Sequence, residues 1–520
     1  MESFFNSIAE INDVINNFVW VKLGLVLLIG TGILMTLLTK VFQVSHFGHW
    51  MKCTIGKMFT KSSHKKEKGS ITQFQALCTA LAATVGVGNI AGVADAIIVG
   101  GPGAVFWMWF AAFFGMMTNY SENVLGIFYR RKNSKNEWCG GAMYYLQDGL
   151  GGKKGFKTIG KVLAVLFSIF CLLASFGIGN MGQVNKIVAN IESAFGSTTL
   201  SEKVIYSTAD GSVTLYSVII GVVLMIIAAL IILGGLNRIA AFAEKVVPFM
   251  VVAFVAGSLI IIGANYGHII PAFKAIFVSA FAPKAIFGAS TGIVVKAAIT
   301  AGFKRGVFSN EAGLGSSVMV HSNSNVREPV QQGMWGIFEV FADTMVVCTM
   351  TALVVLTSGV VDLNTGKLVD GMGGGATLVG EAFNTVFTIG GVKFGGMFIA
   401  IAILLFAFTT VLGWSHYGSK AFEYLFGTKA TIGYKIFFVI MIMSGALMTS
   451  SLAWDISDTF NGLMMLPNLI GVLALSGLVM KITKNYVDRK FRKLDVKPIL
   501  SFDPDTQAEA EAALYADEED

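Results

Sequence analysis

Charged side chains are scarce in this chain of 520 residues: Asp, Glu, Lys and Arg make up 13% of it, and hydrophobic residues make up 54%. Soluble domains carry roughly 25% charged residues, so the composition excludes a protein surrounded by water alone. The apolar residues form continuous blocks of about 20 or more, the length needed to cross a hydrocarbon core. Because a membrane β-barrel would instead alternate apolar and polar residues, the sequence predicts an all-α protein embedded in a lipid bilayer.

Cysteine and histidine are also few, with five and six residues respectively. There is no Cys-x-x-Cys pair and no histidine cluster at metal-ligand spacing, so neither disulfides nor a zinc site is expected. The sequence lacks a phosphate-binding Gly-x-x-x-x-Gly-Lys-Ser/Thr loop and a His-Glu-x-x-His motif, which argues against an ATP-driven pump and against an intramembrane enzyme. No selectivity filter is recognisable either, which leaves an ion channel as a less favoured alternative to a transporter.

Basic residues are absent from the first 17 positions. The positively charged start of a cleavable signal peptide is therefore missing, and the first apolar block is expected to stay attached. The formal net charge of +6 comes from Lys and Arg in short segments beside the apolar blocks, which is the pattern that sets orientation in a membrane. No nucleic-acid partner is expected.

The apolar blocks and the charges between them predict about eleven membrane spans. The loops that follow odd-numbered spans are basic, as at 52–68, 130–154 and 484–493. Since basic loops stay in the cytosol, the N-terminus is predicted to lie outside the cell membrane and the C-terminus in the cytosol. The acidic end of the chain, 501–520, is predicted to be disordered. The spans are approximately 18–40, 71–99, 103–130, 157–191, 213–234, 240–263, 271–303, 329–359, 392–424, 431–450 and 455–481.

Two of these spans carry glycine-rich interruptions, one around Gly86, Gly88 and Gly92 and one at 287–292. Opened backbone survives in a bilayer only where it lines a cavity or holds a ligand, and matching interruptions in two halves of a chain indicate a transporter site. Close packing of small residues is the alternative explanation. The two interrupted spans are five spans apart. Because five is an odd number, a second five-helix unit would enter the membrane from the opposite side, so the two halves are expected to be inverted repeats. The resulting units are 1–70 (first helix and basic loop), 71–265 (first repeat), 266–482 (second repeat) and 483–520 (tail).

One segment carries a specific resemblance. From Gly302 it reads Gly-Phe-Lys-Arg-Gly-Val-Phe-Ser-Asn-Glu-Ala-Gly-Leu-Gly-Ser-Ser, and together with the segments that begin at Gly86 and Asp343 it resembles the alanine or glycine:cation symporter family. The resemblance implies a LeuT-type fold, with one N-terminal helix followed by two inverted five-helix repeats. It also implies a secondary symporter, not an enzyme, that imports alanine or glycine with Na⁺. Proton coupling and the oligomeric state stay open.

An amino-acid zwitterion needs donors for its carboxylate and acceptors for its ammonium, and broken helices supply both from the backbone. Amides from Gly86 to Asn89, with Gly88 between them, are therefore expected to face the carboxylate. Carbonyls freed around Ser290, Thr291 and Gly292 are expected to face the ammonium.

Side chains complete the expected pocket. Gln183 matches the family segment that lines the substrate site, and Trp414, by the same resemblance, walls the pocket and limits it to small substrates. The alternatives are an interhelical hydrogen bond for Gln183 and packing for Trp414. Thr84 is expected beside the substrate and, with Asn89, at a second cation site.

The adjacent hydroxyls of Thr409 and Thr410 suit Na⁺, a hard cation that prefers oxygen ligands. The family resemblance places a sodium site at this pair and completes it with the backbone near Ala82 and Val85.

Several acids lie within the predicted spans, and carboxylates inside a membrane are functional candidates by default. Glu339 and Asp343 are one helical turn apart, with no role assigned to Asp343. A paired structural charge or a position near the cytosolic boundary is the preferred interpretation for Glu122 and Glu339. Glu311 is expected at a cytosolic gate or in a structural turn.

Overall fold

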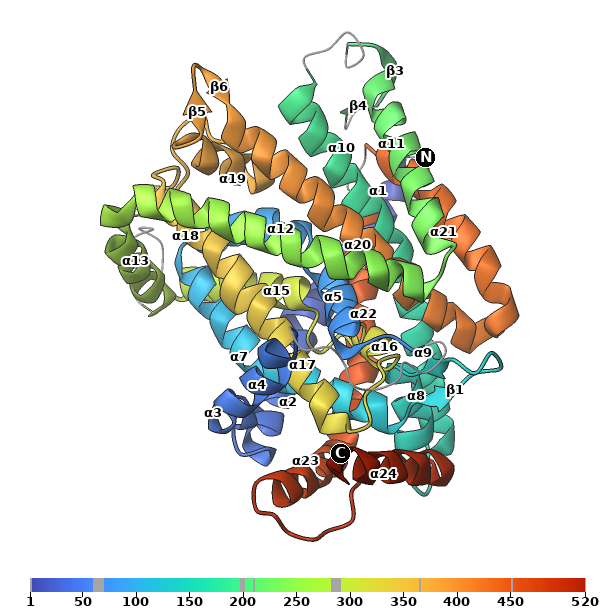
Figure 1. Cartoon of the computed structure of the whole chain (residues 1–520). Coiled ribbons are helices and arrows are strands. Elements are labelled where there is room, and N and C mark those ends of the chain that lie inside the picture. The colour runs from blue at the N-terminus through green and yellow to red at the C-terminus, as the bar shows by residue number, and fades with distance from the viewer. Residues whose placement is uncertain are drawn as a thin grey trace.

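The structure is a computed structural model that describes residues 2–58, 70–196, 202–208, 211–281, 291–363, 366–449 and 452–519. These residues are mostly helical, with three two-stranded antiparallel hairpins at the ends of the bundle (Figure 1). The first half contains α1 (Glu2–Asn17), α2 (Leu25–Leu38), α3 (Phe42–Ser45), α4 (Phe47–Met58), α5 (Gln73–Thr84), α6 (Val93–Gly100), α7 (Gly103–Phe128), β1 (Arg131–Lys132), β2 (Trp138–Cys139), α8 (Ala142–Tyr144), α9 (Lys157–Phe176), α10 (Gly182–Phe195), β3 (Val204–Thr208), β4 (Gly211–Thr214), α11 (Leu215–Ile232) and α12 (Leu236–Ala264).

The second half contains α13 (Ile269–Phe281), α15 (Thr291–Asn310), α16 (Val318–His321), α17 (Pro329–Val340), α18 (Thr349–Thr357), α19 (Gly375–Asn384), β5 (Thr388–Ile389), β6 (Val392–Lys393), α20 (Phe394–Phe426), α21 (Thr431–Ala446), α22 (Leu452–Ala474), α23 (Ser476–Lys490) and α24 (Pro504–Glu519). Wider π-helical turns link several of these helices. They are η1 (Phe18–Gly24), η2 (Gly88–Gly92), η3 (Tyr145–Leu150), η4 (Gly177–Met181) and η6 (Phe341–Cys348).

Seven helices in the described part of the chain are long and apolar enough to cross a membrane, and two bent helix pairs raise that number to nine. They coincide with predicted spans. Of the two further predicted spans, 103–130 corresponds to α7, which has 26 residues, and 271–303 covers most of α13 and the first part of α15. The predicted all-helical membrane class is confirmed.

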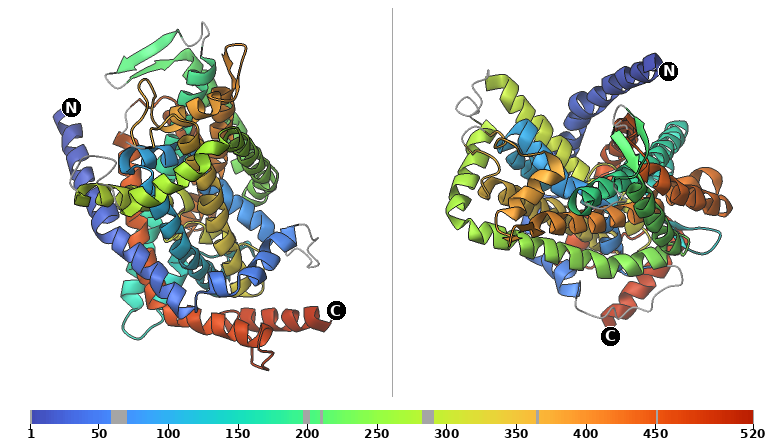
Figure 2. Two further views of the ribbon diagram at one scale, coloured as in Figure 1. Left: turned by 90° about the vertical axis from the view of Figure 1, so that its left-hand side faces the viewer. Right: turned by 90° about the horizontal axis from the view of Figure 1, so that it is seen from above.

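The chain ends lie at opposite ends of the bundle (Figure 2). Helices α23 and α24 lie at one end, which we call the C-terminal side, together with the β1–β2 hairpin (Figure 1). The β3–β4 and β5–β6 hairpins project from the other end, the N-terminal side. An odd number of spans produces this arrangement, because each crossing reverses the direction of the chain.

The predicted disorder of the tail is wrong for most of its length, since Pro504–Glu519 forms helix α24. Asp503 caps the helix start by accepting hydrogen bonds from the Thr506 amide (2.9 Å) and hydroxyl (2.6 Å), and these bonds lower the pKa of the Asp503 carboxyl. The alanines that follow are good helix formers. The Arg327 guanidinium also donates to the Ala513 carbonyl, which ties the tail to the C-terminal side.

Two chain breaks interrupt the bundle. The first lies where it is predicted: α5 ends at Thr84, and the helix that resumes at Gly88 is bent by 58°. Most of the second predicted break, 287–290 with Ser290, lies outside the described residues, and Thr291 and Gly292 begin helix α15. Within the described residues, a second break that the sequence did not predict follows Asn310. There Glu311, with φ of 54°, begins a stretch of left-handed residues that stops the helix, because this conformation cannot continue a right-handed turn.

Candidate functional site

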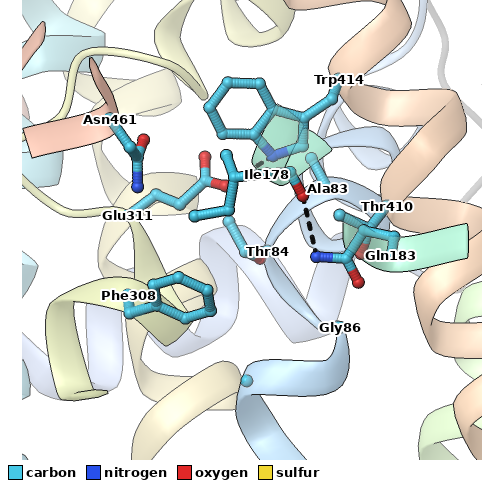
Figure 3. Close-up of a pocket in the computed structure, with 11 residues that line it drawn as sticks. Ala83, Thr84, Gly86, Ile178, Gln183, Phe308, Glu311, Thr410, Trp414 and Asn461 are labelled. Atoms are coloured by element: carbon cyan, nitrogen blue, oxygen red, sulfur yellow. Dashed lines mark hydrogen bonds between the residues drawn. The ribbon is translucent and has the colours of Figure 1, made fainter. Parts of the chain in front are cut away.

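A small pocket lies between the two breaks (Figure 3). Its volume is about 20 Å³, and since one water needs at least about 10–15 Å³, the lining closes around a space smaller than an amino acid. Substrate access therefore requires the lining to move apart. The lining residues are Ala83, Thr84, Gly86, Gly88, Ile178, Gln183, Phe308, Glu311, Thr410, Trp414 and Asn461.

Asn89 holds the first break open. Its side-chain carbonyl accepts a hydrogen bond from the Gly86 amide (2.9 Å), and its own amide bonds to the Gly86 carbonyl (3.3 Å). In a continuous helix these two amides would instead close the carbonyls of Ala82 and Val85, four residues earlier. The break thus releases the two carbonyls at the positions where the family resemblance places a sodium site.

The side-chain amide of Asn89 also anchors the break to the second half of the chain. It donates to the Ser309 hydroxyl on α15 (2.7 Å) and to the Asp343 carboxylate on η6 (2.7 Å). The Ser309 hydroxyl donates in turn to Asp343 (2.6 Å), as does the Thr344 hydroxyl (2.9 Å). Asn89 is therefore a structural element of the break, one layer away from the pocket that Thr84 lines.

The hydroxyl pair on α20 faces the first break. Thr409 and Thr410 both donate to the Phe406 carbonyl, at 2.9 and 3.0 Å, which gathers three buried oxygens. Gly86 lies directly against Thr410, since a Cβ placed on Gly86 would be 2.7 Å from the Thr410 hydroxyl oxygen. The broken helix and the Thr410 hydroxyl are therefore in contact across the pocket, whereas the Thr409 hydroxyl lies beside the Met250 sulfur and does not line the pocket.

Three polar atoms in the pocket lining have no hydrogen-bond partner within the described part of the chain. They are the Thr84 hydroxyl oxygen and the side-chain carbonyl oxygens of Gln183 and Asn461. The Gln183 amide nitrogen is oriented by a bond to the Ile178 carbonyl (3.1 Å; Figure 3). A buried polar atom without a partner costs about 1–3 kcal/mol, so a bound ligand that donates to these atoms would recover that cost.

Trp414 walls the pocket, where the resemblance places it, and packs so closely on Gly179 that a Cβ there would lie 2.4 Å from the indole. Its indole nitrogen donates to the Glu311 carboxylate (2.9 Å). Glu311 lies in the turn after α15, which is one of its two expected places, and there it lines the pocket, which the other expected place at a cytosolic gate did not anticipate. The glycines at 313 and 315, which open the backbone after Glu311, are the sequence signal that was available for this position.

The structure brings together most of the predicted site. Thr84, Gly86, Gly88, Gln183, Thr410 and Trp414 line the pocket. Thr291 and Gly292 do not: Phe308 follows Thr291 by 17 residues of helix α15, which is roughly 25 Å at 1.5 Å per residue. Ile178, Phe308, Glu311 and Asn461 are lining residues that the sequence did not indicate.

A second, larger cavity of about 430 Å³ opens beside the pocket, where α10 and α19 lie. It shares Gly88 and Phe308 with the pocket, so the Phe308 ring separates the two spaces. Trp454 packs against that ring, with centroids 6.0 Å apart. Because α10 leads into the β3–β4 hairpin, this vestibule belongs to the N-terminal side.

On the C-terminal side the pocket is sealed by polar contacts. The Asn468 side chain donates to the Gly313 carbonyl (2.8 Å) and to the Glu122 carboxylate, and Tyr145 donates to Asn468. Farther out, Arg489 pairs with Glu328 at 2.6 Å. The conformation is thus open to the N-terminal side as far as Phe308 and closed to the other side.

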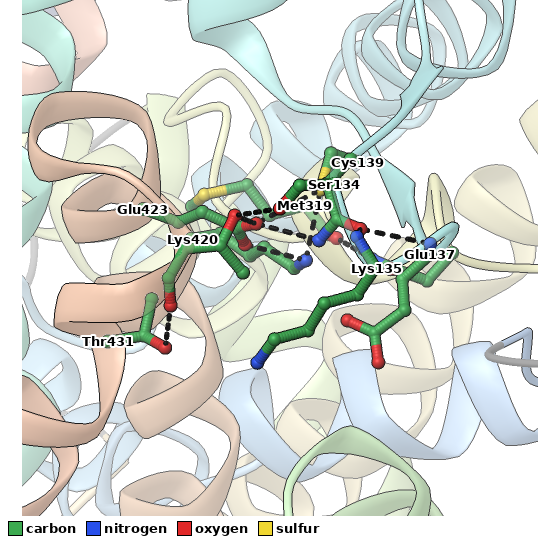
Figure 4. Close-up of polar contacts among 11 residues, drawn as sticks. Ser134, Lys135, Glu137, Cys139, Met319, Lys420, Glu423 and Thr431 are labelled. Carbon is green, nitrogen blue, oxygen red and sulfur yellow. Dashed lines mark hydrogen bonds and ion pairs between the residues drawn. The ribbon is translucent and has the colours of Figure 1, made fainter.

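The remaining buried acids have structural partners. Glu339 bonds to His321 (3.0 Å) and to Asn119 (3.2 Å). At the C-terminal side of α20, Lys420 pairs with Glu423 (3.0 Å) and approaches the Cys139 sulfur (3.2 Å) (Figure 4). The cluster in Figure 4 fastens the β1–β2 hairpin to α20, outside the pocket.

Comparison with known proteins gives a consistent result. The sequence profile of the Sodium:alanine symporter family matches residues 5–499. The chain is 43% identical to the sodium/alanine symporter AgcS of Methanococcus maripaludis, over 93% of this chain and 98% of that protein. It is 33% identical to the probable sodium/glutamine symporter GlnT of Bacillus subtilis, over 93% and 91%. The structure of MhsT in complex with L-phenylalanine has the same fold, with a TM-score of 0.51, 14% identity and coverage of 81% of this chain and 99% of that one.

Proposed function

Because the chain belongs to the sodium:alanine symporter family, we propose that this secondary transporter, which is not an enzyme, imports alanine or glycine together with Na⁺. The observation that carries the proposal is the contact between the first helix break and the Thr410 hydroxyl on α20. In this proposal the carbonyls of Ala82, Val85 and Phe406 and the hydroxyls of Thr409 and Thr410 hold the ion. They supply only oxygen, as a hard cation requires.

The substrate would lie in the pocket beside this ion. Helix η2–α6 starts at Gly88, and its amides, at the positive end of the helix dipole, would face the substrate carboxylate. Phe308 and Trp414 leave little space for a side chain, which favours alanine or glycine over larger amino acids. Alternating access would then consist of movement between the two proposed repeats, 71–265 and 266–482. One movement displaces Phe308 and opens the pocket to the N-terminal side, and the other breaks the Asn468 contacts and opens it to the C-terminal side.

Uptake into proteoliposomes tests this function. We expect labelled alanine or glycine to accumulate when Na⁺ is higher outside, and a proton gradient alone to give no accumulation. A tenfold Na⁺ gradient supplies about 1.4 kcal/mol per ion and supports up to about tenfold accumulation for each Na⁺ coupled. Uptake that a proton gradient drives and a Na⁺ gradient does not would contradict sodium coupling and assign H⁺ as the coupling ion. Uptake of glutamine without uptake of alanine or glycine would contradict the proposed substrate and assign a larger one.

The orientation is a separate proposal: the N-terminal side faces outward and the C-terminal side, which carries the basic loops, faces the cytosol. Cysteines placed at Ser207 on β3 and at Lys135 in the β1–β2 hairpin, both exposed, test it in a background where the half-buried Cys53 is serine. An impermeant maleimide should label Ser207→Cys in intact cells and Lys135→Cys only after permeabilisation. Labelling of Lys135→Cys in intact cells would reverse the topology.

A further inference from the structure

Glu311 stands out among the lining residues as the acidic one. Its side chain enters the pocket because its backbone adopts a left-handed conformation, with φ of 54°, at the end of α15. One carboxylate oxygen accepts the Trp414 indole N–H at 2.9 Å, and the other accepts the Ser316 hydroxyl. Both donors are neutral, so they orient the carboxylate without compensating its charge.

No ion pair within the described residues includes Glu311. The two basic residues nearest in sequence have other partners: Lys304 pairs with Asp458 at 3.0 Å, and Arg305 pairs with Asp95 at 3.5 Å. Glu311 is 5% exposed, and a buried charge without a counter-ion is strongly unfavourable, the more so inside a membrane. A cation that enters the pocket would supply the counter-charge that the ionised carboxylate lacks.

The other polar atoms without partners in the lining are also oxygens, those of Thr84, Gln183 and Asn461. A primary ammonium group has three N–H donors and a positive charge, and it matches these acceptors together with the Glu311 carboxylate. Resting on the proposed function, we propose that Glu311 is the counter-ion of the substrate ammonium group. The pocket then selects amino acids against hydroxy acids and simple carboxylic acids of the same size.

Equilibrium binding of labelled alanine and, separately, of ²²Na⁺ to the purified protein tests this role. Glu311→Gln keeps the shape of the side chain and removes its charge, and we expect alanine affinity to fall by about 10- to 100-fold, the range for a hydrogen bond to a charged group. Sodium binding without substrate should stay within about twofold. Glu311→Asp should fall between the wild type and Glu311→Gln, and Glu509→Gln, on the exposed tail helix, serves as the charge control.

Lactate and propionate are the decisive ligands because they match alanine in size and lack the ammonium group. They should compete poorly with alanine in the wild type, and Glu311→Gln should lose most of this preference. Unchanged alanine affinity in Glu311→Gln, an unchanged preference for alanine over lactate, or an equal loss of ²²Na⁺ binding would overturn the proposal. A wild-type protein that binds neither alanine nor Na⁺ would instead contradict the proposed function. If Glu311→Gln is not monodisperse, the same comparisons on Glu311→Asp decide.

Discussion

Replacement of Thr410 by valine is expected to weaken sodium binding by roughly tenfold or more. Valine is nearly isosteric with threonine but lacks the hydroxyl that lies beside Gly86 and shares the Phe406 carbonyl with Thr409. Loss of one ion contact in a buried site costs about 1–3 kcal/mol, and each 1.4 kcal/mol is a factor of ten. The measurement is the sodium dependence of alanine uptake in proteoliposomes.

Ion and substrate binding are linked, so the same loss must reappear as weaker alanine binding at fixed sodium, and higher sodium must restore it. Thr410→Ser retains the hydroxyl and should retain most of the sodium affinity. Thr357→Val is the matched control, since the Thr357 hydroxyl is also buried and bonds to the carbonyl four residues earlier, Leu353, but lies on α18. Sodium dependence that is the same in Thr410→Val and the wild type would refute the ion site.

Gly88→Leu is expected to abolish transport while the protein remains folded. A Cβ at position 88 would lie 3.0 and 3.2 Å from two atoms of the Phe308 ring, and the rest of a leucine would fill the boundary between pocket and vestibule. Because Phe308 separates these two spaces, the substitution should block the movement that admits substrate. We expect no sodium-driven alanine uptake above background in proteoliposomes.

The control for this prediction is Gly433→Leu on α21. Gly433 is exposed on the outside of the bundle, and a Cβ there meets no atom within 4 Å, so its uptake should match that of the wild type. Gly88→Ala should give an intermediate rate, since the Phe308 ring need yield only a few tenths of an ångström. Gly88→Leu and its control Gly433→Leu should both elute as monodisperse protein in size-exclusion chromatography. Alanine affinity in Gly88→Leu equal to that of the wild type would rule out a site at the first break.

The local part of the site was readable from the sequence because its signals are local. Glycines at 86 and 88 weaken a helix wherever they occur in it, and two adjacent threonines on an apolar helix place two hydroxyls together. These signals located Gly86, Gly88 and Thr410, and the structure brings all three to one pocket. The opening after Asn310 was not predicted because it begins at Glu311, a residue type that rarely adopts the left-handed conformation, and the signal of Gly313 and Gly315 comes only after it.

By itself, the sequence determined the membrane class, the position of the first break and the hydroxyl pair, since hydrophobic length, glycine content and residue adjacency are properties of short segments. Only the tertiary structure decided the contacts between distant segments. Asn89 meets Asp343 across 254 residues, and Trp414 meets Glu311 across 103. Helical periodicity shows which residues share a face but not which helix that face meets. At the first break, the Gly86 amide bonds to the Asn89 side chain in place of a backbone carbonyl. This bond and the position of Glu311 in the pocket both depend on such packing between helices.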